Sequence, residues 1–217
     1  MKSILWMTAV VAIFAFFSCD PTASRQCPAF EFDVAKWADL DNLDTIRYFN
    51  PADSSELVFV KTESSKSGVN TQGGIGYKNE DDVPCYLNAD YNYVLLGIED
   101  SLGMQITFDQ LEIANLPESE EDVVVYYIFY KTGINKGIAS HAFLVQPHEL
   151  VKNGGQEWVD ELTVDGATYT DLVKSSRDTF MIESENPKFD FWQAYGVRQA
   201  GVVKLVNRLG EEYWLEK

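Results

Sequence analysis

The chain has 217 residues, of which 34 are acidic and 17 are Lys or Arg, and its formal charge at neutral pH is −17. This charge repels phosphate-rich polymers and argues against a nucleic-acid partner, although an acidic surface also serves solubility alone. The length is sufficient for one large domain or two small ones.

The N-terminus carries an export signal. Lys2 precedes an apolar run from Ile4 to Phe17, which ends at Ser18-Cys19. A positive start, a short apolar stretch and a small residue before the cleavage point are typical of a secretory signal, and the stretch is too short for a membrane span. One interpretation is that this is an ordinary secretory signal and that the presence of Cys19 at its end is incidental.

The Ser18-Cys19 junction resembles the signal of bacterial lipoproteins, in particular those of the Bacteroidetes. The resemblance implies that residues 1–18 are a signal peptide and that a lipid is attached to the sulfur of Cys19. We therefore expect a protein of the cell envelope, lipid-anchored in the outer membrane and facing either the periplasm or the cell surface. Its first partner is then the membrane itself, which the lipid enters.

Two segments follow the signal. Residues 19–28 are polar and without apolar periodicity, which predicts a tether. Residues 29–217 are expected to form a single β-rich domain, with the acidic stretch 117–122 as the best candidate for a seam between subdomains. Cys27 and Cys85 predict a disulfide in an oxidising envelope, the alternative being two separate buried thiols.

The start of the domain is ambiguous, because residues 29–43 fit either an edge strand or a short helix. Strand patterns then dominate, and 146–152 is the one later segment that predicts a short helix. Turn residues recur about every ten positions, which predicts an all-β, mostly antiparallel meander, built as a sandwich or as an open or half barrel with at most one or two short helices. Strands are predicted over 45–50, 56–62, 91–98, 103–108, 123–131, 136–145, 158–164, 168–173, 179–182, 201–206 and 212–215. The strand 123–131 is apolar on both faces and is predicted to lie between two layers.

The C-terminal part has a recurrent pattern. Residues 162–173 contain Gly166-Ala-Thr-Tyr169, and residues 191–215 contain an aromatic strand, an apolar strand after Gly201 and a closing Gly210-Glu-Glu-Tyr-Trp214-Leu. This pattern resembles the C-terminal part of lipoproteins of the Bacteroidetes, which implies a β meander. In physical terms the two turn glycines supply positive φ, and Tyr169 and Trp214 cover the neighbouring strand faces.

Metal and zinc-hydrolase motifs are incomplete. The segment from Asp39 to Asp44 is spaced like a calcium loop, but it lacks the central Gly, and Asn50 stands where the bidentate Glu is required. His148-Glu149 begins a zinc-protease motif in which Lys152 replaces the second His. We therefore predict no metal site and no cofactor.

Catalytic motifs are equally weak. Ser140 and His141 are neighbours on a predicted strand, so their side chains point to opposite faces. His141 shares its face with Phe143 and is expected to be a packed or surface histidine. No catalytic residue is predicted, and the chain is interpreted as a non-enzyme.

Aromatic residues near the C-terminus are the strongest indication of a ligand. Phe189, Phe191, Trp192 and Tyr195 cluster beside Gln193, and flat rings with nearby amides are used to bind sugars. The alternative is that the rings fill the core, which we expect of Phe189 and Phe191. Trp192 points away from Phe191 in a regular strand, so Trp192 and Tyr195 are the candidate ligand-binding residues.

Three functions fit these observations. The first is a lipid-anchored, non-enzymatic binding or assembly protein that recognises a glycan or an envelope protein. The second is a periplasmic carrier that holds a lipid or another hydrophobic ligand in an incompletely closed barrel. The third is an envelope hydrolase that uses carboxylates.

Overall fold

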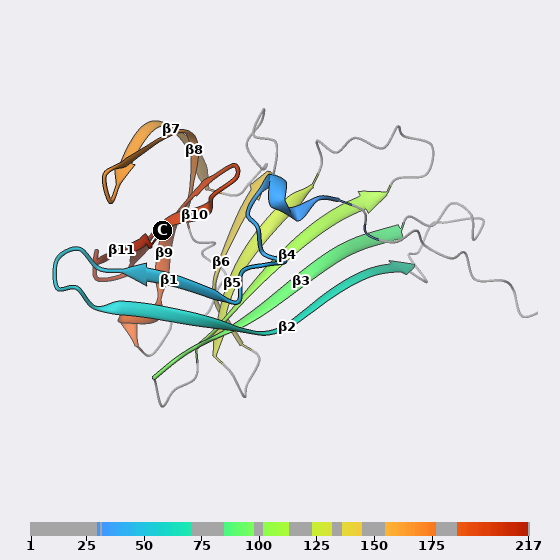
Figure 1. Ribbon diagram of the computed structural model, residues 1–217, viewed down its shortest axis with the longest axis horizontal. Helices are drawn as coiled ribbons and strands as arrows, with labels where there is room; N and C mark the ends of the chain where they lie inside the picture. Colours follow the sequence, from blue (N-terminus) through green and yellow to red (C-terminus); the bar gives the residue numbers. More distant parts are fainter. Residues whose placement is uncertain are drawn as a thin grey trace, which may run out of the picture.

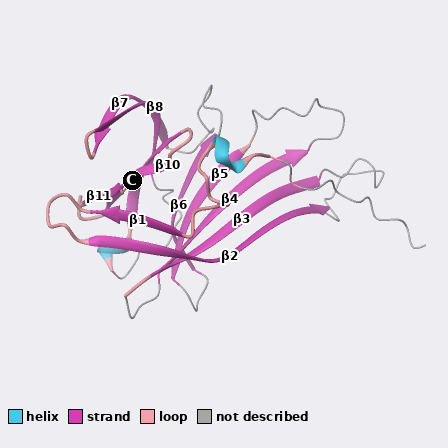
Figure 2. Cartoon of the chain, viewed as in Figure 1, coloured by secondary structure: helices cyan, strands magenta, loops and turns pink. Residues whose placement is uncertain are grey.

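The described chain is almost entirely antiparallel β structure. The computed structural model describes residues 30, 32–70, 85–97, 102–112, 123–131, 136–144, 155–176 and 186–216. Its eleven strands form one sheet, which curls into a half-barrel (Figures 1 and 2). The all-β meander prediction is confirmed in its open half-barrel form. The strands are β1 (Thr45–Phe49), β2 (Glu56–Asn70), β3 (Cys85–Leu95), β4 (Leu102–Glu112), β5 (Val124–Lys131), β6 (Lys136–Leu144), β7 (Gln156–Val164), β8 (Ala167–Ser176), β9 (Phe191–Val197), β10 (Gly201–Asn207) and β11 (Glu212–Leu215).

The sheet consists of two meanders joined by β1. Its strand order is β6-β5-β4-β3-β2-β1-β11-β10-β9-β8-β7, so β2 to β6 form one half and β7 to β11 the other. β1 pairs with β2 on one side and with β11 on the other, where Tyr48 lies opposite Leu215 and Phe49 opposite Trp214. The earliest and the latest strands of the chain therefore hold the two halves together.

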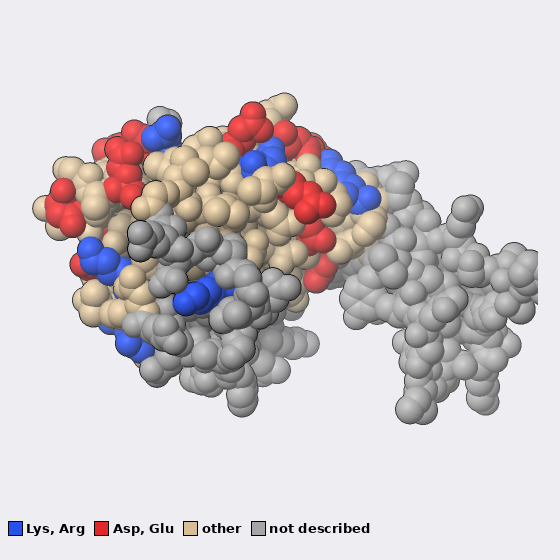
Figure 3. Space-filling view, turned by 90° about the horizontal axis from the view of Figure 1, so that it is seen from below, with Lys and Arg blue, Asp and Glu red and all other residues tan. Residues whose placement is uncertain are grey.

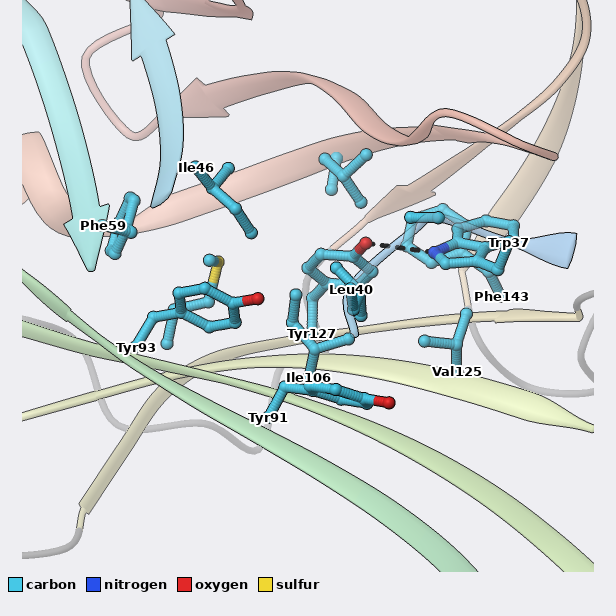
Figure 4. Close-up of a cluster of buried hydrophobic side chains, with 14 of the residues drawn as sticks. Trp37, Leu40, Ile46, Phe59, Tyr91, Tyr93, Ile106, Val125, Tyr127 and Phe143 are labelled. Carbon is cyan, nitrogen blue, oxygen red and sulfur yellow. Dashed lines mark hydrogen bonds between the residues drawn. The ribbon is translucent and has the colours of Figure 1, made fainter. Parts of the chain in front are cut away.

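The N-terminal segment lies inside the curl. Residues 34–36 form a single 3₁₀ turn, η1 (Val34–Lys36), which decides the ambiguous segment in favour of a short helix. Trp37, which is 2% exposed, stacks near Phe143 with ring centroids 5.4 Å apart and donates a hydrogen bond from Nε1 to the Tyr127 hydroxyl at 3.0 Å (Figure 4). Leu40 is equally buried. These side chains fill the space that the curled sheet encloses.

Polar contacts fix the next part of this segment to β2 and β3. Asp41 accepts hydrogen bonds from the Tyr91 hydroxyl at 2.6 Å and from Lys66 Nζ at 2.9 Å. Lys61 donates to the Leu40 carbonyl at 2.7 Å. Burial raises the pKa of Asp41, but the two hydrogen bonds outweigh it and hold this pKa below the usual value. β2 continues to Asn70, well past the predicted end at residue 62, because Glu63 to Asn70 pair with Asn92 to Cys85 of β3.

A second, smaller apolar cluster lies on the opposite face of β9 and β10. Leu172, Val197 and Val203 are buried there, and the β7–β8 hairpin packs over them. Because Val202 and Leu205 belong to the main core, β10 is buried on both faces. The two-layer position predicted for β5 is wrong: its buried residues alternate with half-buried ones, so only one of its faces lies in the core.

Several predictions fall outside the described residues. They are the strand over 179–182, the helix over 146–152, the seam at 117–122, the anchor Cys19 and the disulfide partner Cys27. Cys85 is the first residue of β3. The disulfide therefore stays a prediction. A second 3₁₀ turn, η4 (Pro187–Phe189), precedes β9.

The filled interior leads to a test at Gly196 of β9. A Cβ atom there would lie 2.7 Å from Phe143 and 2.8 Å from the indole of Trp37. Both rings are enclosed, so Gly196→Ala is expected to lower the free energy of unfolding by about 1–3 kcal/mol, measured by chemical denaturation.

Gly103→Ala is the matched control, because the three atoms nearest to its added methyl group all belong to the ring of Tyr130, which is half-buried and can move outward. A smaller loss at Gly196 than at Gly103 would contradict the proposed packing.

Candidate ligand-binding face

β9 separates the aromatic residues singled out in the sequence. Phe191 is fully buried and packs against Phe129, with ring centroids 4.6 Å apart, and Phe189 packs against the same core. Trp192 is 45% exposed. The expectation that Trp192 points away from the core while its neighbours fill it is confirmed.

Tyr195 is half-buried and has both apolar and polar neighbours. Its ring packs against the second apolar cluster, and its hydroxyl donates to Gln193 Oε1 at 3.4 Å. Lys204 Nζ lies 5.2 Å from the ring centroid, a cation–π distance. Tyr195 is therefore partly structural, and its removal alters packing as well as the surface.

Strand register brings further side chains into line with Tyr195. Directly paired residues of antiparallel strands share a face, so the register defines a cross-strand row that runs over seven neighbouring strands. The row consists of Glu157, Lys174, Tyr195, Lys204, Trp214, Phe49 and Glu56, from β7 across to β2. Chain neighbours of these residues, namely Val173, Ala194, Leu205, Tyr213 and Tyr48, belong to the main core. The cross-strand row thus lies on the outer face of the sheet.

Charges along the cross-strand row are paired. Lys174 Nζ lies 2.5 Å from Glu157, and this hydrogen bond raises the pKa of Lys174. Lys204 is only 8% exposed, and its Nζ lies 2.6 Å from Glu212. A lysine this buried requires such a partner, because an unpaired charge would lose its hydration without compensation.

The aromatic part of the row lies over β11 and β1. Trp214 is half-buried and donates from Nε1 to Glu212 Oε2 at 3.2 Å. Its ring meets Phe49 edge-on, with centroids 6.0 Å apart and an interplanar angle of 72°. Along the row, Lys204 lies between the rings of Tyr195 and Trp214, and Phe49 follows Trp214 directly.

Sequence reasoning singled out Trp192 and Tyr195, but it did not place Lys204 beside Tyr195, or Glu212 and Phe49 beside Trp214. Trp214 was predicted only to cover a strand face. The missing information is the register between strands, which two irregularities in the β9–β10 pairing displace.

His141 is a packed histidine, as predicted. It is buried beside Phe129, and its Nε2 lies 3.1 Å from the Phe191 carbonyl oxygen, a hydrogen bond between β6 and β9. Ser140 lies on the other face of the strand and is half-buried. The two residues are not brought together as a catalytic pair.

The carboxylates of the loop after η1 are held by the protein itself. Asp39 accepts a hydrogen bond from Asn42 at 3.0 Å, and Asp41 is bound by Tyr91 and Lys66. In the described part of the chain, no group of three or more His, Cys, Asp or Glu side chains is placed to hold a metal ion. Among the same residues, no helix has the length and apolar character needed to cross a membrane.

Comparison with known proteins gives no relative. No protein family, curated protein or solved structure matches the chain. No enzyme family is therefore identified. The outer face of the sheet, with Trp192 and the cross-strand row, is the feature that bears on function.

The outward position of Trp192 is testable by stability alone. Trp192→Ala is expected to change the free energy of unfolding by no more than about 0.5 kcal/mol, because the residue is 45% exposed and belongs to neither buried apolar cluster. Phe191→Ala, one residue earlier, should cost about 3–5 kcal/mol. Comparable losses at the two positions in urea denaturation would show that Trp192 belongs to the core.

Proposed function

We propose that this chain is a lipid-anchored, non-enzymatic binding protein of the cell envelope, and that the outer face of β8 to β11 binds a glycan. The observation that carries the proposal is the 45% exposure of Trp192 on β9, the strand from which Tyr195 joins Lys204 and Trp214 in the cross-strand row. Trp192 belongs to neither buried apolar cluster, so the exposed part of its indole is available to a ligand.

The chemistry of the face suits a sugar. The apolar side of a pyranose ring stacks on flat aromatic surfaces such as Trp192, while its hydroxyl groups exchange hydrogen bonds with amides and charged groups. Gln193 and Glu212 supply an amide and a carboxylate on this face, and both are half-buried. Acidic and basic side chains are also interspersed around uncharged surface in the view from below (Figure 3).

The interior of the half-barrel supports a binding protein over a lipid carrier. In the described residues the inner side of the sheet packs against Trp37, Leu40 and Phe191, so an acyl chain would have to displace core side chains. A ligand on the outer face requires no such rearrangement.

The proposed lipid anchor places the proposed glycan binding at a membrane. The proposed lipid on Cys19 would hold the face near a membrane, because each buried CH₂ of an acyl chain contributes about 0.8 kcal/mol and lipoproteins carry two or three chains. The tether of residues 19–28 then sets how far the domain reaches from the bilayer.

The proposed anchor predicts the behaviour of Cys19→Ser. The variant loses the only sulfur at which lipid would be attached, so it should move from the membrane fraction to the soluble fraction after cell lysis and ultracentrifugation. A Cys19→Ser protein that still sediments with membranes would exclude lipid attachment at this residue.

The binding proposal is tested with the unlipidated chain, residues 20–217, on a glycan array and by affinity electrophoresis in polysaccharide gels. Trp192→Ala should weaken binding about tenfold or more while leaving the thermal unfolding midpoint unchanged. Tyr195→Phe tests the hydroxyl of the second predicted residue without removing its packed ring.

Trp158→Ala is the matched control. Trp158 is 44% exposed, almost as much as Trp192, but it pairs with Val173 of the main core and so lies on the other face of the sheet. Loss of binding on Trp158→Ala but not on Trp192→Ala would contradict the site, and binding of envelope proteins in place of any glycan would contradict the ligand class.

A further inference from the structure

The cross-strand row carries its charges in pairs, and this restricts the ligand. Glu157 is bound to Lys174, and Glu212 to Lys204. At the far end, Glu56 lies 3.6 Å from Arg47. No lysine or arginine of this row lies without an acidic partner within 4.0 Å.

An acidic sugar is disfavoured on such a face. Its carboxylate or sulfate would have to displace Glu157 or Glu212 from a lysine, and it would meet the repulsion of a chain with formal charge −17. A hydroxyl group both donates and accepts, so it can use the carboxylate and the ammonium group of a pair without separating them. The pairing therefore selects a neutral ligand that is rich in hydroxyl groups.

The spacing of the row restricts the shape of the ligand. Neighbouring strands lie about 4.8 Å apart, so Tyr195 on β9 and Trp214 on β11 are separated by roughly 10 Å, with Lys204 of β10 between them. In an extended β-linked polysaccharide, each pyranose ring advances the chain by about one strand spacing. Rings of the protein would then lie under alternate sugars.

We infer that the ligand is a neutral, extended β-linked polysaccharide whose chain lies across the strands, along the row from Lys174 to Phe49. The inference rests on the proposed glycan-binding function and names the class of glycan and its direction on the sheet. Tyr195 and Trp214 contact alternate sugar rings, and the Glu212 carboxylate, which is held by the buried Lys204, accepts hydrogen bonds from the hydroxyl groups between them. Trp192 borders this path on β9.

The test uses the unlipidated chain in gels that contain neutral polysaccharides (hydroxyethylcellulose, xyloglucan, galactomannan) or acidic ones (polygalacturonate, alginate). We expect retardation by at least one neutral polymer, little change between 50 and 500 mM NaCl, and at least a tenfold loss on Trp214→Ala. Among oligosaccharides of two to six units, calorimetry should show affinity rising to about five units, the span of the five strands from β8 to β1.

A charge substitution tests the role of pairing. Glu157→Gln frees Lys174, so it should increase retardation by polygalacturonate while binding to the neutral polymer stays within about twofold. Glu161→Gln is the matched control. It removes the same charge from an exposed position of the same strand, where Glu161 pairs with Thr170 and not with Lys174. Equal gains for the two variants would overturn the pairing argument.

The outcomes separate the inference from the function on which it rests. Retardation by acidic polymers alone, abolished by Trp192→Ala, would keep the glycan-binding function and overturn the neutral class. Neutral binding that depends on Trp192 but is unchanged in Trp214→Ala would overturn the direction across the strands. No retardation by any polymer, neutral or acidic, would overturn the proposed function and the inference with it.

Discussion

The packing of Trp37 inside the curled sheet is the contact on which the structure depends. An open half-barrel has a large inner face of aromatic side chains that would otherwise meet water, and a single sheet has no second layer to cover it. The N-terminal segment fills this space, and the hydrogen bond from the indole to Tyr127 satisfies two polar groups that would be costly to bury unpaired. Asp41, Lys61 and Lys66 then fix the segment to the sheet from its polar side.

This arrangement leaves the outer face available for recognition. Because the core is inside the curl, the side chains between core positions on β9 to β11 point outward without being needed for burial of the main core. The β7–β8 hairpin covers only part of that face, over Val203 and Leu172. Trp192 is 45% exposed, whereas Tyr195 packs against the covered cluster and Lys204 lies buried beside Glu212, so the cross-strand row is partly covered.

Local pattern predicted much of the fold and only part of the candidate site. Alternation along single strands was enough for the antiparallel β class, for most strand positions, and for Trp192 pointing away from Phe191. It failed for β2, because the polar residues after Thr62 have no apolar alternation and are held by pairing with β3. Lys204 and Trp214 could not be placed beside Tyr195, since that depends on pairing between strands that the bulges in β9 and β10 shift.

The position of β1 between β2 and β11 has a consequence for the order of folding. The pairing of Tyr48 with Leu215 joins residues separated by nearly the whole chain, and contacts of such long sequence separation form slowly. The two halves of the sheet cannot be joined until the final strand has been synthesised. For a chain that crosses a membrane before it folds, as proposed here, this dependence delays the joining of the two halves, whereas the neighbouring strands within each half can pair earlier.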